Sequence, residues 1–256
     1  CPHIPLLPQE SVLRRSSAPG RQMLYNVELS TIAKDNFHYR SKVIIRILSS
    51  VYIGLTIITT LLLKYAGMCW FDAITHAMSS CSTCGFSTKN ASVAFWDSPA
   101  IEGIIMGAMT VSAIHFGILY ATITGRRNNI FRSEVVRTFI GMMLVITIVI
   151  AFSLWSGDIY PTLGESFRHS AFQVVSITTT TGFATADTNL WTPLAIALLV
   201  LCSVICGCAG STSGGMKVDR VLIATKVIRQ RMKLQLHPNA VIRIKVDGLV
   251  QDERVQ

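Results

Sequence analysis

Long apolar segments without charged residues recur along most of the chain, separated by polar stretches. Four windows contain no Asp, Glu, Lys or Arg, namely 47–63, 103–125, 138–157 and 188–216. A helix needs about 20 consecutive apolar residues to cross the hydrocarbon core of a bilayer. The pattern therefore predicts four membrane-spanning helices, over 43–66, 101–123, 135–154 and 192–216.

Two shorter helical segments lie between these predicted spans. Residues 70–82 lie between the first and second spans and residues 163–178 between the third and fourth, and neither is long enough to cross a bilayer. A glycine-centred polar run follows each of them, over 83–88 (the first run) and over 179–185 (the second run). Backbone without regular structure is tolerated at membrane depth only where protein buries it or where it lines a water-filled path.

The two runs are similar to each other at a separation of 97 residues. Four positions are identical, namely Thr83/Thr180, Gly85/Gly182, Phe86/Phe183 and Thr88/Thr185. The order of span, short helix, irregular run and span therefore occurs twice, in 43–125 and in 126–216. Because each unit contains two spans, both units have the same orientation in the membrane. We expect an all-α polytopic membrane protein with two parallel span–pore-loop–span repeats.

The composition agrees with a membrane protein and adds a topology. Of the 256 residues 50% are hydrophobic and 14% are charged, and the mean hydropathy is +0.48. The net charge is +9, and basic residues cluster before the first span, in the linker 126–134 and after the fourth span. The positive-inside rule then places both ends and the linker in the cytoplasm. Since no basic patch is interleaved with aromatic residues, nucleic-acid binding is not expected.

Both ends of the chain are expected to be cytoplasmic extensions. Residues 1–42 form a lead-in that starts at Cys1 instead of Met, and its first 20 residues are proline-rich and irregular, as in a fragment or an aberrant start. Residues 217–256 are expected to form a basic helix and a tail. Within the tail, Asp247-Gly248 between Val246 and Leu249 predicts a short hairpin.

The paired runs are candidates for binding a partly dehydrated cation. Backbone carbonyls can replace the water of an ion without trapping it, and glycine permits the φ values that turn successive carbonyls toward one axis. A polar turn between two helices is the alternative, which a single run would favour but a matched pair does not. The predicted ion-binding residues are Thr83, Cys84, Gly85, Phe86, Thr180, Thr181, Gly182 and Phe183.

Two further segments suggest a gate. Small residues from Gly107 to Gly117 within the second span indicate either close helix packing or a broken helix that obstructs a pore. Residues 207–215 contain four glycines, which weaken a helix. Lys217 and Arg220 follow directly, and they are either positive-inside anchors or a charge placed against the pore.

The sequence gives no support to an enzyme or to a resident metal or cofactor. It contains no phosphate-binding loop, no G-x-S-x-G and no H-E-x-x-H motif. Cys81 and Cys84 have C-x-x-C spacing, but a second pair that would close a zinc site is absent. We therefore expect no enzymatic activity and no cofactor.

The chain resembles the Trk/Ktr/HKT superfamily of potassium transporters, and in particular the C-terminal half of the bacterial Trk-type uptake subunits. The resemblance covers residues from about 20 to 256. It rests on the short helices with their runs, FDAITHA at 71–77 before the first run and FQVVS at 172–176 before the second, and on GCAGSTSGGMKV at 207–218. One departure is Cys84, where the family motif usually has glycine.

The resemblance implies potassium uptake across the bacterial inner membrane through a selectivity filter made of four such loops. This chain contains two of them, so the other two must come from upstream sequence, as the missing N-terminal half of the same subunit, or from another chain. The family also implies a homodimer in membrane lipid, a cytoplasmic nucleotide-binding regulatory subunit, potassium as substrate, and a gate at Gly107, Gly117, Lys217 and Arg220.

Two other functions remain open from the sequence. One is transport of sodium or of several cations by a member of the same superfamily, because single glycines replace the longer filter motif of potassium channels. The other is a membrane anchor or assembly subunit that does not conduct ions.

Overall fold

The computed structural model describes residues 41–123, 130, 133–236, 244–246 and 249–251. Residues 1–40 of the predicted lead-in over 1–42, the linker arginines Arg126 and Arg127, and much of the tail after 236 lie outside the described residues. The helices are α4 (Ser41–Tyr65), α5 (Trp70–Cys81), α6 (Pro99–Ser112), α7 (Phe116–Ile123), α8 (Glu134–Ser156), α9 (Leu163–Thr178), α10 (Pro193–Val204) and α11 (Val218–Leu236).

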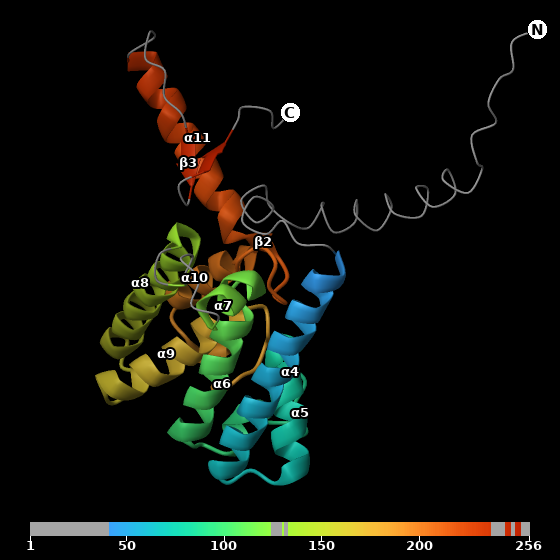
Figure 1. Ribbon diagram of the computed structural model, residues 1–256. Helices are drawn as coiled ribbons and strands as arrows, with labels where there is room; N and C mark the ends of the chain where they lie inside the picture. Colours follow the sequence, from blue (N-terminus) through green and yellow to red (C-terminus); the bar gives the residue numbers. More distant parts are fainter. Residues whose placement is uncertain (1–40, 124–129, 131–132, 237–243, 247–248, 252–256) are drawn as a thin grey trace, which may run out of the picture.

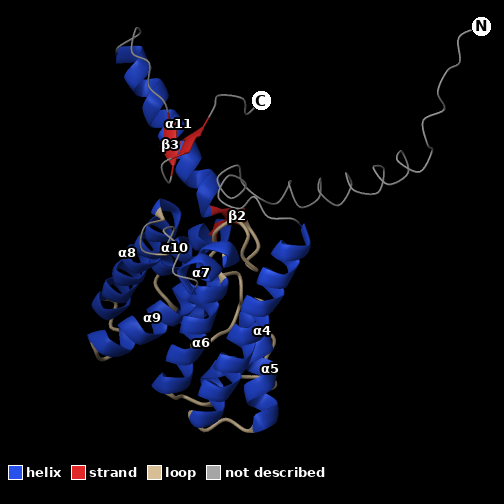
Figure 2. Cartoon of the chain, viewed as in Figure 1, coloured by secondary structure: helices blue, strands red, loops and turns tan. Residues whose placement is uncertain are grey.

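The helices form two groups, each with one long and one short helix side by side (Figure 1). In the first group α4 packs against α5 and α6, and in the second α8 packs against α9 and α10. Contacts between α6 and α9 join the groups, and α11 extends away from the bundle (Figures 1 and 2). Short 3-10 turns, Ser92–Phe95 and Thr188–Leu190, follow the two glycine-centred runs.

Local capping explains where the shorter helices begin. The Sγ of Cys69 accepts the Asp72 N–H at the start of α5, and the Oγ1 of Thr162 accepts the Glu165 N–H at the start of α9. At the start of α10, Thr192 accepts the Ala195 N–H and proline occupies the first turn. Each cap satisfies a backbone donor that has no partner within its helix.

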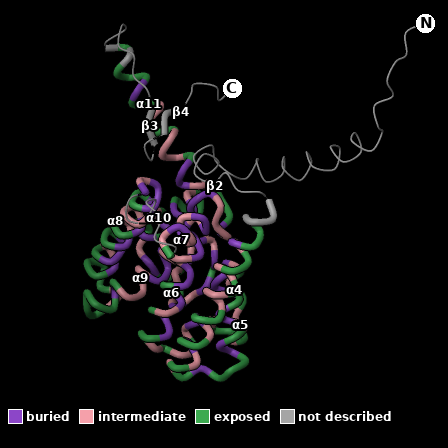
Figure 3. The backbone as a smooth tube through the Cα atoms, viewed as in Figure 1, coloured by how far each residue is buried: buried purple, intermediate pink, exposed green. Residues whose placement is uncertain are grey.

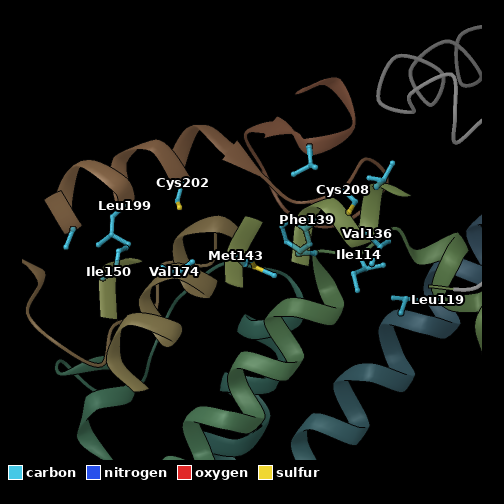
Figure 4. Packing of buried hydrophobic residues seen from close by; sticks show 14 of the residues in the cluster. Ile114, Leu119, Val136, Phe139, Met143, Ile150, Val174, Leu199, Cys202 and Cys208 are labelled. Atoms are coloured by element: carbon cyan, nitrogen blue, oxygen red, sulfur yellow. The ribbon is translucent and has the colours of Figure 1, made fainter. Parts of the chain in front are cut away.

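Two apolar cores hold the groups together. One lies among α7, α8 and α10, where Ile114, Leu119, Phe139, Ile150 and Leu199 gather (Figure 4). The other lies among α4, α5 and α6, and it also receives Phe172 and Phe183 from the second half of the chain. The two halves therefore share a core, to which the second run contributes Phe183, and buried residues gather toward the centre of the helical bundle (Figure 3).

The outer faces of the long helices are apolar and exposed, as a lipid-facing surface requires. The exposed apolar side chains on α4 and α8 include Ile53, Ile57, Ile58, Leu61, Leu144, Val145, Ile148 and Phe152. Within the described residues, α4 and α8 are long and apolar enough to cross a membrane, and α6 with α7 makes a third span if the bent pair is taken as one. The chain is thus a mostly helical membrane protein.

Two predicted spans differ from the observed helices. The helix expected over 192–216 ends at Val204, after which Ile205–Cys206 and Met216–Lys217 form a short parallel strand pair and the glycines between them stay irregular. The helix expected over 101–123 is broken, because α6 and α7 are bent by 102°. The predicted hairpin is confirmed, since Ile244–Val246 (β3) pairs antiparallel with Leu249–Gln251 (β4).

Candidate pore-loop site

The two glycine-centred runs leave their short helices in the same way. The N–H groups of Ser82, Thr83 and Cys84 donate to the carbonyls of Met78, Ser80 and Ser79 over 3.0, 3.4 and 3.0 Å. The N–H groups of Thr179, Thr180 and Thr181 donate to those of Val175, Ile177 and Ser176, each over 2.9 Å. These are the same three hydrogen bonds shifted by 97 residues. The sequence repeat is therefore also a repeat of backbone geometry.

Both runs contain the same unusual backbone conformation. Thr83 has a φ of 52° and Gly85 of 71°, and the equivalent Thr180 and Gly182 have 58° and 86°. A positive φ is uncommon for a β-branched residue and indicates a conformation that the surroundings impose, often at a functional site. Because the residues between them do not have a positive φ, the alternation can turn successive carbonyls toward one side, as a carbonyl-lined path requires.

The runs lie against each other. A Cβ placed on Gly85 would stand 1.9 Å from the carbonyl oxygen of Thr181, so only glycine permits this approach. The second run also contacts the 3-10 turn that follows the first run, because the Ala94 N–H donates to the Ala184 carbonyl over 3.2 Å and the Ala184 N–H donates to the Ser92 hydroxyl over 3.2 Å. These contacts fix the first and second runs as neighbours.

The glycine-rich segment 207–215 contacts both runs through their threonines. The Thr83 hydroxyl donates to the Thr212 carbonyl over 3.0 Å, and the Gly214 N–H donates to the Thr180 hydroxyl over 2.7 Å. Thr83 and Thr180 occupy equivalent positions in the repeat. The segment 207–215 therefore forms a hydrogen bond with the equivalent threonine of each run.

The same segment satisfies the backbone at the break between α6 and α7. The Ala113 carbonyl accepts the Cys208 N–H over 2.9 Å, the Ser112 carbonyl accepts the Thr212 hydroxyl over 3.2 Å, and the Phe116 N–H donates to the Gly210 carbonyl over 3.3 Å. A broken helix at membrane depth needs partners of this kind for its freed backbone groups. The sequence left two alternatives for residues 107–117, a closely packed continuous helix and a broken helix. The structure has the broken helix.

The first turn of α11 is anchored to this segment. The Lys217 ammonium donates to the Ser213 carbonyl, and the buried Asp219 carboxylate accepts the Ala209 N–H over 3.0 Å. Arg220 is exposed. The two candidate gate cations thus differ, because the charge of Lys217 is engaged by a loop carbonyl whereas the Arg220 side chain faces open space.

Charged pairs near the short helices were not predicted from the sequence. Arg168 on α9 forms a two-pronged ion pair with Glu102 on α6, at 2.7 and 2.8 Å, and also contacts Asp97 at 2.9 Å. In the first half, Asp72 accepts the Thr88 hydroxyl over 2.6 Å and pairs with Lys89 at 3.8 Å. The Thr88 hydrogen bond lowers the pKa of Asp72, while burial opposes it, so this carboxylate stays ionised beside the first run.

The predicted ion-binding residues lie together but are not equally exposed. Thr83, Thr181 and Phe183 are buried, Gly85 and Thr180 are half-buried, and Cys84, Phe86 and Gly182 are exposed. Cys81 is buried and Cys84 exposed, both as free thiols. Among the described residues no group of three His, Cys, Asp or Glu side chains could hold a metal ion. The site thus offers backbone carbonyls and hydroxyls as ligands, which suits a weakly bound alkali cation.

Comparisons with known proteins identify the family of the chain. The family model of TrkH, a cation transport protein, matches residues 18–255. The Trk system potassium uptake proteins TrkH of Salmonella typhimurium and of Escherichia coli K12 are 38% and 36% identical over 239 residues, which is 92% of this chain and 49% of each relative. TrkG of Escherichia coli K12 is 34% identical over 75% of this chain and 40% of its own length.

A solved structure is also similar to this chain in fold and in sequence. The crystal structure of the potassium transporter TrkH from Vibrio parahaemolyticus superimposes with a TM-score of 0.77 at 36% identity, over 81% of this chain and 45% of that one. The chain spans about half the length of the curated relatives that it matches. Its family is one of ion transporters and not of enzymes. The chain belongs to the TrkH family of cation transport proteins.

Proposed function

We propose that this chain is the C-terminal half of a potassium uptake subunit and that its two runs form half of a selectivity filter. The observation that supports this most strongly is the repeated backbone of the runs, with the same hydrogen bonds and the same alternation of φ at Thr83, Gly85, Thr180 and Gly182. Potassium is the substrate and no cofactor takes part. The chain then contains two parallel span–pore-loop–span repeats, 43–125 and 126–216.

The ion is held by the carbonyls of residues 83–86 and 180–183. Each run begins where a short helix ends, at Cys81 of α5 and at Thr178 of α9. The C-terminal end of a helix has a partial negative charge, which favours a cation near the start of each run. Neutral dipoles stabilise the dehydrated ion without binding it so tightly that it cannot leave.

The other half of the filter comes from sequence upstream of this chain. Phe183 of the second run is 1% exposed because it packs on the preceding repeat, with its ring centre 5.7 Å from that of His76 on α5. Phe86 occupies the equivalent place in the first run and is 80% exposed. By the same repeat geometry, Phe86 packs on a short helix of the missing half.

The subunit lies in the bacterial inner membrane with both ends of this chain in the cytoplasm, where the basic residues of α11 follow the last apolar helix. It works as a homodimer surrounded by membrane lipid. The basic helix α11 extends from the bundle and offers a docking surface to a cytoplasmic nucleotide-binding regulatory subunit (Figure 1).

The gate lies at the break between α6 and α7, between Gly107 and Gly117, with the basic start of α11 beside it. A fixed charge about 12 Å from an ion raises the energy of that ion by about 1.4 kcal/mol at an effective dielectric constant of about 20, which is about tenfold in rate. We assign this role to Arg220, whose side chain is exposed in the first turn of α11. Arg220→Gln in the full-length protein is expected to raise basal rubidium influx by about tenfold.

Lys217→Gln is the matched control, because it removes the same charge three residues earlier. The Lys217 ammonium already contacts the Ser213 carbonyl, so its loss loosens the segment 207–215. We expect a lower thermal stability from Lys217→Gln with no gain in influx. Equal influx from wild type and Arg220→Gln, at equal amounts of folded protein, would remove Arg220 from the gate.

Rubidium and sodium fluxes of the full-length protein in proteoliposomes test the function itself. A potassium transporter prefers rubidium to sodium, and Gly182→Ser reduces this preference because a residue with a side chain is strained at a φ of 86°, so that the backbone of the run, with its carbonyls, relaxes away from this conformation. Equal fluxes of both cations in the wild type would favour a mixed-cation transporter. If the protein carried neither cation, and another subunit supported growth on low potassium, the membrane-anchor function would be favoured.

A further inference from the structure

His76 of α5 lies completely buried behind the two runs. Its Nδ1 is 2.8 Å from the Asp72 carbonyl of its own helix, and its Nε2 is 2.9 Å from the Ser87 hydroxyl at the end of the first run. Ser87 follows Gly85 by two residues. His76 thus connects a helix with the outer part of a predicted filter segment.

The partners of His76 determine its protonation. A carbonyl only accepts, so Nδ1 carries the hydrogen and donates to Asp72. Burial lowers the pKa of His76, which keeps the ring neutral and makes Nε2 an acceptor. The Ser87 hydroxyl therefore donates to Nε2, and its oxygen accepts the Lys89 N–H over 3.1 Å. This chain of hydrogen bonds fixes the backbone from Ser87 to Lys89 on α5.

The ring of His76 also contacts the second run. It stacks on Phe183 with 5.7 Å between the ring centres and 19° between the planes. Trp96 meets it edge-on, with 4.9 Å between the centres. Since Ser87 belongs to the first run and Phe183 to the second, the His76 side chain contacts both runs.

The second repeat uses the equivalent position for the same purpose. Gln173 of α9 lies 97 residues after His76, is buried, and donates to the Ala186 carbonyl over 3.3 Å. Ala186 lies just after the second run, as Ser87 lies at the end of the first. In both halves, a buried polar side chain in the middle of the short helix holds the strand that leaves the run.

We infer that His76 is a positioning residue for cation selectivity, which holds the first run in register with the second through its hydrogen bond to Ser87. This inference rests on the proposed function. A side-chain hydrogen bond contributes about 1 kcal/mol, so its loss is expected to change the ratio of rubidium to sodium flux by about fivefold. The effect appears in the ratio and not only in the amount of folded protein.

Three variants of the full-length protein in proteoliposomes test this assignment. His76→Phe keeps an aromatic ring beside Phe183 but removes the acceptor for Ser87, and Ser87→Ala removes the same hydrogen bond from its other end. Both are expected to lower the rubidium-to-sodium flux ratio by about fivefold, and the double variant by no more than either one. His76→Gln restores an acceptor, as the natural Gln173 position suggests, and is expected to keep the ratio within about twofold of the wild type.

The outcomes separate this inference from the proposed function. If Gly182→Ser lowers the ratio while His76→Phe and Ser87→Ala leave it unchanged, the runs select the cation but His76 does not position them. Additive effects in the double variant, or an equal loss in His76→Gln and His76→Phe, would likewise overturn the inference. If Gly182→Ser also leaves the ratio unchanged, the filter proposal itself fails.

Discussion

Gly85→Ala is expected to abolish cation transport by the full-length protein, whereas Gly182→Ala should leave part of it. The new Cβ at residue 85 would lie 1.9 Å from the Thr181 carbonyl oxygen and 2.9 Å from its carbon, so one run must move away from the other. At Gly182 no atom lies within 4 Å of the new Cβ. The substitution at Gly182 costs only the strain of a left-handed backbone, about 1–2 kcal/mol.

This pair of variants separates collision from backbone strain, because both glycines have a positive φ. Rubidium uptake into proteoliposomes, normalised to folded protein, gives the comparison. We expect no detectable uptake from Gly85→Ala and reduced uptake from Gly182→Ala. Wild-type uptake from Gly85→Ala would mean that the two runs are not in contact in the working transporter.

Arg168→Met is expected to give the largest loss of stability among single substitutions outside the runs. Glu102 is 1% exposed and receives both prongs of the Arg168 guanidinium. Removal of one partner leaves a buried charge without compensation, which costs about 3–5 kcal/mol. The pair joins α9 to α6, so its loss also weakens the contact between the two halves. Thermal unfolding of the full-length protein in detergent measures the effect.

Two further variants serve as controls for this loss. Arg168→Met with Glu102→Gln removes both charges and should recover much of the stability. Asp97→Asn breaks only an exposed contact to the same arginine and should change the unfolding temperature little, because exposed ion pairs contribute at most about 1 kcal/mol. A stable Arg168→Met single variant would show that the Glu102 side chain does not depend on Arg168 for compensation in the native subunit.

The sequence predicts much of the helical scaffold because apolar length is a local property. Each of α4 and α8 contains a single glycine and no proline, and both helices form close to the expected bounds. The window 188–216 has the same lack of charge, but its glycines at 207, 210, 214 and 215 do not support a helix. Hydrophobicity alone does not separate a spanning helix from an irregular segment that protein covers.

The break at Ala113 shows a second limit of the sequence. The small residues between Gly107 and Gly117 are compatible with a straight, closely packed helix as well as with a bend. The bend is stabilised by Cys208, Gly210 and Thr212, about 100 residues later in the chain. Such a distant partner leaves no mark on the local pattern.

The candidate site was partly predictable for a similar reason. The repeat of Thr83-Cys84-Gly85 at Thr180-Thr181-Gly182 is visible in the sequence, and it marks the runs. Their supports are not visible there. Arg168 and Glu102 stand 66 residues apart, and His76 meets Phe183 only after two repeats pack together. Glu102 lies directly before the charge-free window 103–125. A charged residue at the edge of an apolar segment needs a partner, and this is the one sequence signal that could have pointed to Arg168.

A crystal of the full-length protein grown with rubidium or thallium tests the central claim most directly, because the anomalous scattering of these ions locates them. The proposal predicts bound ions in line with the carbonyls of residues 83–86 and 180–183, with further ligands from the upstream half. Ions bound only elsewhere, or runs whose carbonyls face away from every aqueous path, would contradict it.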